Sequence, residues 1–227
     1  MAGAVGERAV LQVLALRVDP AWRRLPAEER RADREAFARA IRQHAAVATL
    51  AYSTLGLRAD AELVLVRTAP TLDDLLDSAA QLLRSGVGRY ATIAHAFTGL
   101  LRASRYVKKP GAQEQALISG ERARYLVVYP FTKTAAWYQL GREARQGMMN
   151  EHIRVGHDFP QVRQLLAYST GLDDQEFIVA YETDDLAAFQ DLVTALRETD
   201  ARPYTLRDQP ILTAIHHALD DALELLG

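Results

Sequence analysis

The chain has 227 residues, of which 49% are hydrophobic, a formal net charge of −2 at pH 7 and no cysteine. This length buries one large core or two small ones, and a near-neutral chain without a basic stripe is not expected to bind nucleic acid. The absence of cysteine excludes disulfides, thiolate nucleophiles and cysteine-bound clusters, which leaves histidine as the main candidate metal ligand. No apolar stretch approaches the ~20 residues that span a bilayer, and the N-terminus lacks a signal-peptide pattern. We therefore expect no membrane span and a cytoplasmic location.

The first half of the chain predicts the order strand, helix, strand, strand, helix. An apolar run indicates a strand over Val10–Leu16, and a helix over Pro26–Ala46 has acidic residues in its first turn. A strand starts at Ala51–Thr54, an alternating run indicates the next strand over Glu62–Val66, and an Asp-rich helix follows over Leu72–Leu83. This is the order of a ferredoxin-like module.

The second half repeats this order. Its predicted elements are the strand Tyr125–Tyr129, the helix Gly141–Val155, a strand that starts at Ala167–Thr170, the strand Glu176–Tyr181 and the helix Leu186–Leu196. The tetrapeptide Ala-Tyr-Ser-Thr opens a strand in both halves, and a Trp precedes the long helix in both. The repetition predicts an α+β fold of two tandem ferredoxin-like modules.

We place the two modules at residues 1–103 and 121–227, joined by a connecting loop over 104–120. A Lys-Lys-Pro-Gly sequence and polar residues in this loop favour a solvated linker over a lid. Before the loop, Arg89–Leu101 is equally compatible with a strand and with a helix. At the C-terminus, Leu212–Leu226 predicts a short amphipathic helix.

The duplication makes each half a control for the other, since a residue that only the fold requires should occur in both. His152 precedes the second Ala-Tyr-Ser-Thr by the same number of residues as Ala36 precedes the first, and Gln164 corresponds in the same way to Ala48. These departures predict that function lies in the C-terminal half. Trp137 has a counterpart in the first half, so its role is at least partly structural.

His152 shares an apolar helix face with Met148 and Met149, because these methionines lie four and three positions before it. A histidine in this setting is usually a hydrogen-bonded core imidazole. A neutral imidazole on an apolar wall also suits axial ligation of a haem iron, with methionines packing on the macrocycle. Zinc is less well supported, because His157 lies five residues further on and no HExxH spacing exists.

Tyr129 ends its predicted strand, directly before Pro130. A tyrosine at a strand end is commonly a buried aromatic with a satisfied hydroxyl, or else a redox-active phenol that faces a cofactor. Lys133 is either a surface residue or an anchor for the carboxylate of an anionic ligand. The acidic pairs at 173–174 and 184–185 are explained by a turn and a helix N-cap, respectively.

Five motifs between Tyr125 and Pro210 together resemble the chlorite dismutase superfamily. They are Tyr-Leu-Val-Val-Tyr-Pro-Phe-Thr-Lys at 125–133, Trp-Tyr at 137–138, Met-Met-Asn-Glu-His at 148–152, Tyr-Ser-Thr-Gly-Leu-Asp-Asp at 168–174 and Glu-Thr-Asp-Asp at 182–185. Before Ser104 only the plan of the modules and the length agree. The resemblance implies a closed β-barrel-like core with the helices outside, and a ring-shaped homo-oligomer, most often a pentamer.

The resemblance also implies haem b, or its precursor coproheme, between the helix and the sheet of the C-terminal half. The histidine of the family's Glu-His motif corresponds to His152, which is thereby implied as the iron ligand. Phe131, Trp137 and Met149 are expected to contact the porphyrin.

Two positions separate the activities of this family. Chlorite-decomposing members have a distal arginine where this chain has Gln164, and a glutamate that hydrogen-bonds the iron ligand where it has Ala201. Loss of that acid weakens donation from the histidine to the metal. Both departures are similar to the HemQ-type coproheme decarboxylases, which use hydrogen peroxide to oxidise two propionates of iron-coproporphyrin III to vinyl groups and so form haem b.

In those enzymes a tyrosine of the Tyr-Pro-Met/Phe motif forms a radical and a nearby lysine holds a propionate, which implies these roles for Tyr129 and Lys133. Some members use a distal histidine in the loop that corresponds to 108–120, where this chain has none, so Gln164 or water takes its place. We therefore expect a coproheme decarboxylase. The alternatives are a haem b-dependent chlorite dismutase or peroxidase of the same superfamily, and a haem-binding protein without turnover.

Overall fold

The computed structural model describes residues 9–104, 106 and 120–227. The predicted connecting loop over 104–120 therefore lies almost entirely outside the described residues. The chain forms two compact units that divide after Leu101, and Thr213–Gly227 belongs to the N-terminal one. In the part of the chain that the structure describes, no helix is long and apolar enough to cross a membrane. The module limits at 1–103 and 121–227 stay a prediction.

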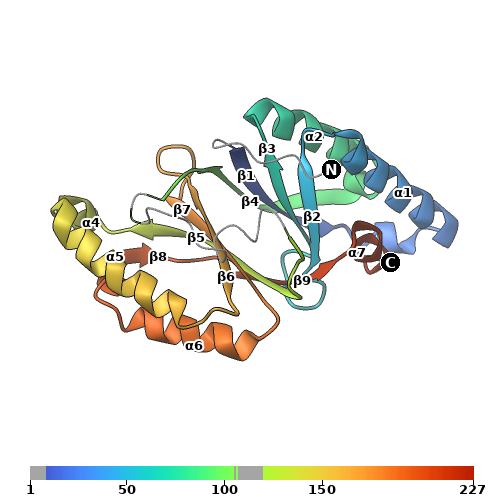
Figure 1. Ribbon diagram of the computed structural model, residues 1–227. Helices are drawn as coiled ribbons and strands as arrows, with labels where there is room; N and C mark the ends of the chain where they lie inside the picture. The colour runs from blue at the N-terminus through green and yellow to red at the C-terminus, as the bar shows by residue number, and fades with distance from the viewer. Residues whose placement is uncertain (1–8, 105, 107–119) are drawn as a thin grey trace. The chain divides into compact units, whose positions relative to one another are not determined.

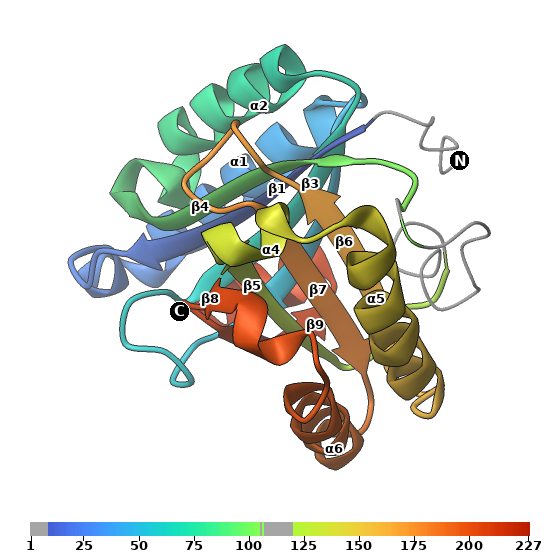
Figure 2. The ribbon, with the colours of Figure 1, turned by 90° about the vertical axis from the view of Figure 1, so that its left-hand side faces the viewer.

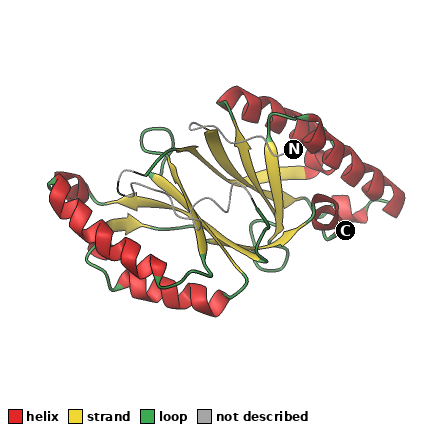
Figure 3. Ribbon diagram, viewed as in Figure 1, coloured by secondary structure: helices red, strands yellow, loops and turns green. Residues whose placement is uncertain are grey.

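An antiparallel sheet with helices on one side forms the N-terminal unit (Figures 1 and 3). Its elements are β1 (Ala9–Val18), η1 (Trp22–Arg24), α1 (Ala27–Gln43), β2 (Ala48–Ser53), β3 (Leu63–Ala69), α2 (Leu72–Arg84), η2 (Gly86–Tyr90), β4 (Ala91–Leu101), β9 (Leu212–His217) and α7 (Leu219–Glu224). The strands lie in the order β4-β1-β3-β2-β9 through antiparallel pairings. β1 and β3 are buried along nearly their whole length, and alternate residues of the two strands, among them Leu14, Leu16, Leu63 and Leu65, pack in one cluster with α1.

The core of this unit is a closely packed apolar cluster between the sheet and α1. Trp22 and Phe37 are 0% and 1% exposed, and both belong to this cluster together with residues of β1, β3 and α7. The indole Nε1 of Trp22 donates a hydrogen bond to Asp33 Oδ2 at 3.0 Å. The space under α1 is thus filled by the protein's own side chains.

The C-terminal unit repeats the plan with a second antiparallel sheet. Its elements are β5 (Tyr125–Lys133), α4 (Ala135–Gln139), α5 (Arg142–His157), β6 (Arg163–Tyr168), β7 (Phe177–Thr183), α6 (Leu186–Arg197), η3 (Arg202–Tyr204) and β8 (Thr205–Arg207). The strand order is β8-β5-β7-β6. α5 and α6 lie on one side of this sheet in Figure 1, and Figure 2 shows α4 and α5 in front of its strands. As predicted, Asp185 caps a helix, since its carboxylate accepts hydrogen bonds from the first backbone N–H groups of α6.

The predicted order of strands and helices is confirmed in both units, but three local predictions are wrong. The Ala-Tyr-Ser-Thr sequence ends a strand in each unit and does not open one, since β2 ends at Ser53 and β6 at Tyr168, and β5 continues past Tyr129 to Lys133. The third correction lies at the C-terminus. Leu212–Leu226 is not a single helix, because the strand β9 precedes α7. Leu212 and Ala214 are buried and alternate with half-buried residues, which is the period of a strand, and Ser53 of β2 pairs with Ile215. The ambiguous segment before the loop, β4, is a strand.

Candidate functional site

The helix-side face of the C-terminal sheet carries two of the predicted site residues. Tyr129 on β5 lies opposite Val179 on β7, and Gln164 on β6 lies opposite Tyr181 on β7. Because side chains alternate along a strand, all four share one face, and Tyr181 packs there with Leu192 of α6. The sheet therefore brings Tyr129 and Gln164 to the same face, on strands that only β7 separates.

The imidazole of His152 on α5 is neutral and incompletely hydrogen-bonded. Its Nδ1 atom is buried and has no hydrogen-bond partner among the described residues. The pKa of His152 is lowered to about 4, chiefly by burial and secondly by the Lys133 ammonium, while Glu151 opposes the fall. At neutral pH one ring nitrogen therefore has a lone pair that can bind a metal. A buried imidazole nitrogen usually has a hydrogen-bond partner, so the unpartnered Nδ1 distinguishes His152 from an ordinary core histidine.

The turn between α6 and η3 packs beside His152. The backbone N–H of Asp200 donates to Glu151 Oε2 at 3.1 Å, which ties this turn to α5. The next residue, Ala201, is 3% exposed and offers no polar side chain to a neighbouring ring. A carboxylate at this position could accept a hydrogen bond from an imidazole and make it a stronger electron donor to a metal. Alanine cannot do so, which agrees with the unpartnered Nδ1 of His152.

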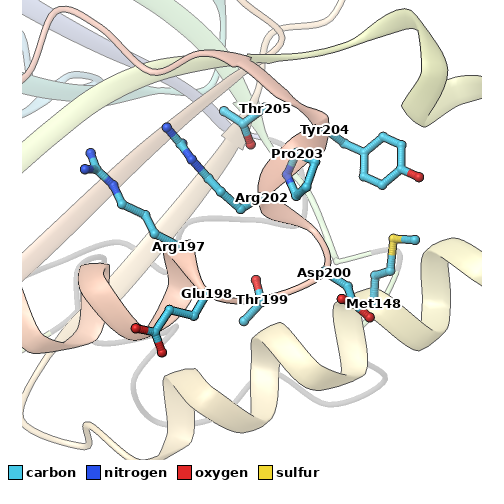
Figure 4. A pocket seen from close by; sticks show the side chains of 9 residues that line it. All are labelled: Met148, Arg197, Glu198, Thr199, Asp200, Arg202, Pro203, Tyr204 and Thr205. Carbon is cyan, nitrogen blue, oxygen red and sulfur yellow. The ribbon is translucent and has the colours of Figure 1, made fainter.

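A cavity of about 640 Å³ opens between α5 and this turn. Cavities of this size commonly hold cofactors and drug-sized ligands. Its lining consists of Met148 from α5 and of residues from the end of α6 to β8, namely Arg197, Glu198, Thr199, Asp200, Arg202, Pro203, Tyr204 and Thr205. In Figure 4 the guanidinium groups of Arg197 and Arg202 extend toward one side, whereas Met148 and Tyr204 lie at the other. The lining also contains two carboxylates, with Asp200 beside Met148 and Glu198 on the side of Arg197, so both arginines and both acids border the cavity.

Lys133, at the end of β5, is held by the protein's own groups. Its Nζ atom lies 4.7 Å from the centre of the Trp137 ring and 3.3 Å from Thr205 Oγ1. The pKa of Lys133 is lowered to about 8, chiefly by burial and secondly by Arg202, while Glu176 opposes the fall. The ammonium group is therefore positioned against an aromatic ring, and Trp137 has a contact that Trp22 lacks.

The phenol of Tyr129 is half-buried and lies beside a second phenol. The ring centres of Tyr129 and Tyr181 are 6.1 Å apart, and the two hydroxyls are hydrogen-bonded to each other. Burial raises the pKa of Tyr129 and Asp208 adds to the rise, whereas Tyr181, Arg197 and Arg202 oppose it. Arg197 and Arg202, the two arginines of the cavity, both favour a negative charge on the Tyr129 oxygen. Because Coulomb interactions weaken with distance, this effect indicates that both guanidinium groups lie near the phenol.

The structure brings several predicted site residues together but places none of them in the cavity lining, which lacks Tyr129, Phe131, Lys133, Trp137, Met149, His152 and Gln164. Lys133 Nζ lies 5.9 Å from the centre of the Phe131 ring, so Phe131, Lys133 and Trp137 form one cluster. Met148 lines the cavity, whereas Met149, the predicted porphyrin contact, is not among the lining residues. Adjacent helical residues point about 100° apart, which is why only one of the two methionines reaches this space.

Sequence reasoning missed three polar residues of this region. Arg197 and Arg202 line the cavity, and Tyr181 is the hydrogen-bond partner of Tyr129. The alternation of Tyr181 with Val179 along one strand was a usable signal, because it predicts a shared face. No such signal identified the two arginines, because the turn that positions them has no hydrophobic periodicity.

The chain belongs to the chlorite dismutase family, because the family's sequence model, described as Chlorite dismutase, matches residues 17–217. A coproheme decarboxylase from Mycolicibacterium smegmatis is 29% identical over 177 residues, which cover 77% of this chain and 75% of the relative. A chlorite dismutase from Ideonella dechloratans is 31% identical over 127 residues, which cover 53% of this chain and 45% of the relative.

A solved structure confirms the α+β fold. The chlorite dismutase from Candidatus Nitrospira defluvii, in complex with imidazole, superposes with a TM-score of 0.88 at 29% sequence identity. The superposition covers 96% of this chain and 94% of the other. The family includes enzymes with two different named activities, so the family alone does not decide the reaction of this chain.

Proposed function

We propose that this protein is a coproheme decarboxylase, which binds iron-coproporphyrin III in its C-terminal unit and converts it to haem b with hydrogen peroxide. The observation that carries the proposal is the neutral imidazole of His152, whose Nδ1 has no partner among the described residues, on the helix whose Met148 lines a cavity with two guanidinium groups, Arg197 and Arg202. A neutral nitrogen donor suits the iron, and cations suit the carboxylates of the substrate. The similarity to the coproheme decarboxylase of Mycolicibacterium smegmatis supports the same reaction.

His152 is the proposed iron ligand. Because its ring is uncharged at neutral pH, no proton has to leave a ring nitrogen before the iron binds. Since Ala201 provides no acid, His152 donates electrons to the metal more weakly than a histidine paired with a carboxylate does. Met148 and Tyr204 supply apolar and aromatic surface for a macrocycle. When the iron porphyrin is bound, it supplies the redox chemistry that no side chain of the protein can supply alone.

Arginines of the cavity are the proposed carboxylate-binding groups. Arg202 pairs with Asp208 at 2.7 Å, whereas Arg197 has no ion-pair partner among the described residues. Guanidinium groups bind carboxylates through paired hydrogen bonds. Lys133, which we also propose to hold a propionate, contributes positive charge from its site beside Trp137.

Tyr129 is the proposed relay between the iron and a propionate. A carboxylate held by Arg197 or Arg202 would lie near its phenol, since both cations act on this residue. Each propionate that becomes a vinyl group loses one carbon dioxide, one proton and two electrons, and the two electrons reduce one hydrogen peroxide to two waters. The protein's own step in this reaction is the release and recovery of a hydrogen atom at the Tyr129 oxygen. Gln164, on the same face of the sheet, offers a neutral amide.

Product analysis tests the proposal. Apoprotein is mixed with iron-coproporphyrin III, hydrogen peroxide is added in steps, and the porphyrin is identified by mass. We expect loss of two carboxyl groups and formation of haem b. Unchanged porphyrin after excess peroxide would contradict the proposal and favour a haem-binding protein without turnover.

A chlorite-decomposing enzyme is the second candidate, because the relative from Ideonella dechloratans carries that name. The neutral side chain of Gln164 argues against it, since an amide holds an anionic chlorine oxide less strongly than a guanidinium does. Oxygen evolution from chlorite by the haem b-loaded protein measures this activity. Fast and sustained evolution would favour the second candidate over the first.

A further inference from the structure

The two arginines of the cavity lining differ in their partners. In Figure 4 both guanidinium groups extend toward the same side. Arg202 Nη1 donates a hydrogen bond to Asp208 Oδ2 at 2.7 Å, and the two side chains are 36% and 22% exposed, so water reaches both. Arg197 is exposed and forms no ion pair within the described part of the chain. One arginine is therefore open to an anion from solution, whereas the protein itself neutralises the other.

The backbone around the Arg202–Asp208 pair is held by other contacts. Arg202 lies in η3, just before β8, and Asp208 follows β8 directly. β8 pairs with the end of β5, and the carbonyl oxygen of Tyr204 accepts a hydrogen bond from the N–H of Thr134 at 2.9 Å. Because these contacts fix the segment independently of the ion pair, the Arg202 side chain can change its partner while the cavity wall stays in place.

A ligand carboxylate can take the place of Asp208 at this arginine. The described pair consists of one hydrogen bond, whereas a guanidinium can hold a carboxylate through two parallel ones. Water screens a partly exposed ion pair, which keeps it weak. Asp208 itself is not among the residues that line the cavity, so a carboxylate inside the cavity competes with an acid that lies outside the lining.

We infer that Asp208 is a specificity-determining residue, which stands in for a ligand carboxylate at Arg202 while the cavity is empty and so keeps small anions from this arginine. A free phosphate ion has to displace Asp208 without other contacts to compensate. A carboxylate of iron-coproporphyrin III is held near Arg202 by the rest of the bound porphyrin, which gives it a high effective concentration. The inference rests on the proposed function, because it concerns the carboxylates of the proposed substrate.

The same exchange distinguishes the proposed substrate from the proposed product. A propionate that has become a vinyl group no longer competes for Arg202, so Asp208 pairs with the arginine again. Asp208 therefore opposes the binding of a porphyrin that brings a carboxylate to Arg202 and has no effect on one that does not. Its removal should strengthen binding of the first kind of porphyrin alone.

The test measures the affinity of the apoprotein for metal-free porphyrins by their fluorescence, so the result depends neither on the iron ligand nor on turnover. In Asp208→Asn we expect coproporphyrin III to bind about fivefold more tightly, which is the strength of a partly exposed ion pair. Affinity for protoporphyrin IX, which has fewer carboxylates, should stay unchanged. Asp191→Asn, exposed on α6 and outside the cavity lining, removes the same charge and is the control.

Two further measurements separate this role from a general effect of charge or stability. In the background of Arg202→Met, Asp208→Asn should change the affinity for coproporphyrin III less than about twofold, because the coupled partner is absent. Inorganic phosphate should weaken binding of coproporphyrin III to Asp208→Asn more than to wild type, since phosphate then reaches Arg202. Asp208→Ser serves for the same comparisons if Asp208→Asn folds poorly.

The outcomes separate this inference from the proposed reaction. Equal or weaker binding of coproporphyrin III by Asp208→Asn, or the same gain in the Arg202→Met background, would overturn the role of Asp208 and leave the proposed reaction standing. A protein that shows the expected gain, yet does not convert iron-coproporphyrin III with peroxide, would overturn the proposed reaction and leave the role of Asp208 standing.

Discussion

The two units follow the same order of elements but treat the space under their long helix differently. α1, with 17 residues, buries Phe37, Ala38, Ala40 and Ile41 against its sheet. α5, with 16 residues, has no buried residue and contributes Met148 to a cavity of about 640 Å³. The comparison indicates that side-chain volume under the helix, and not the fold, decides which unit can accept a ligand.

The repeated tryptophan shows the same contrast at one position. Trp22 is bonded through its indole N–H to the carboxylate of Asp33 at 3.0 Å. Trp137 instead has the ammonium of Lys133 4.7 Å from its ring centre and Tyr204 at 5.7 Å, which is a residue of the cavity lining. The same position of the repeated fold thus supports a core in one unit and the wall of the candidate site in the other.

The largest expected difference between the units is in stability. Phe37→Ala should lower the free energy of unfolding by about 3–5 kcal/mol, because it removes a ring from a filled core. Met148→Ala should lower it by less than about 1 kcal/mol, because its side chain already borders an open space. Urea denaturation of both variants measures this, and equal losses would contradict the comparison.

The next effect concerns ligand binding. His152→Ala should weaken binding of iron-coproporphyrin III at least about 100-fold, since loss of groups that only support a metal ligand already costs 10–100-fold. Absorbance titration of the apoprotein measures the affinity, and His157→Ala, an exposed histidine of the same helix, is the matched control. Ala36→His should create no binding in the N-terminal unit. Unchanged affinity in His152→Ala would rule out the proposed ligand.

The neutral imidazole also predicts a pH dependence of the apoprotein. The pKa of His152 is lowered to about 4, so below its ordinary value of about 6.5 the unfolded chain takes up the proton first. Its contribution to stability is therefore present above pH 6.5 and is lost as the pH falls toward 4, by about 2 kcal/mol. Denaturation of wild type and His152→Ala at pH 7 and pH 4.5 measures the difference, which should change between the two pH values. A constant difference would mean that the ring is not held neutral.

The smallest expected effect is a difference in affinity between porphyrins that carry different numbers of carboxylates. Arg197→Met is expected to weaken binding of iron-coproporphyrin III about tenfold, or ~1.4 kcal/mol, and to weaken binding of haem b less because haem b has fewer carboxylates. Arg154→Met, an exposed arginine on α5, is the control. Equal affinities of wild type and Arg197→Met for both porphyrins would remove Arg197 from carboxylate recognition.

The order of elements was predictable from the sequence because hydrophobic periodicity is a local property. Strands and helices repeat at 2.0 and about 3.6 residues, so both modules and the cap at Asp185 could be predicted. The end of the chain could not, since β9 is a strand through pairings such as that with β2, and pairing joins residues that are far apart in sequence. The predicted pentamer, closed barrel and cytoplasmic location stay predictions.

For the candidate site, the sequence by itself singled out His152 and Gln164, because a duplication exposes the positions at which the copies differ. Only the tertiary structure decided that Nδ1 of His152 has no partner within the described part of the chain, that Lys133 lies against Trp137 and that Met148 rather than Met149 borders the cavity. It also brought Arg197, Arg202 and Tyr181 into the neighbourhood of Tyr129. The physical reason is that a side chain's partners and its pKa depend on neighbours from other elements, and no local pattern in the sequence records them.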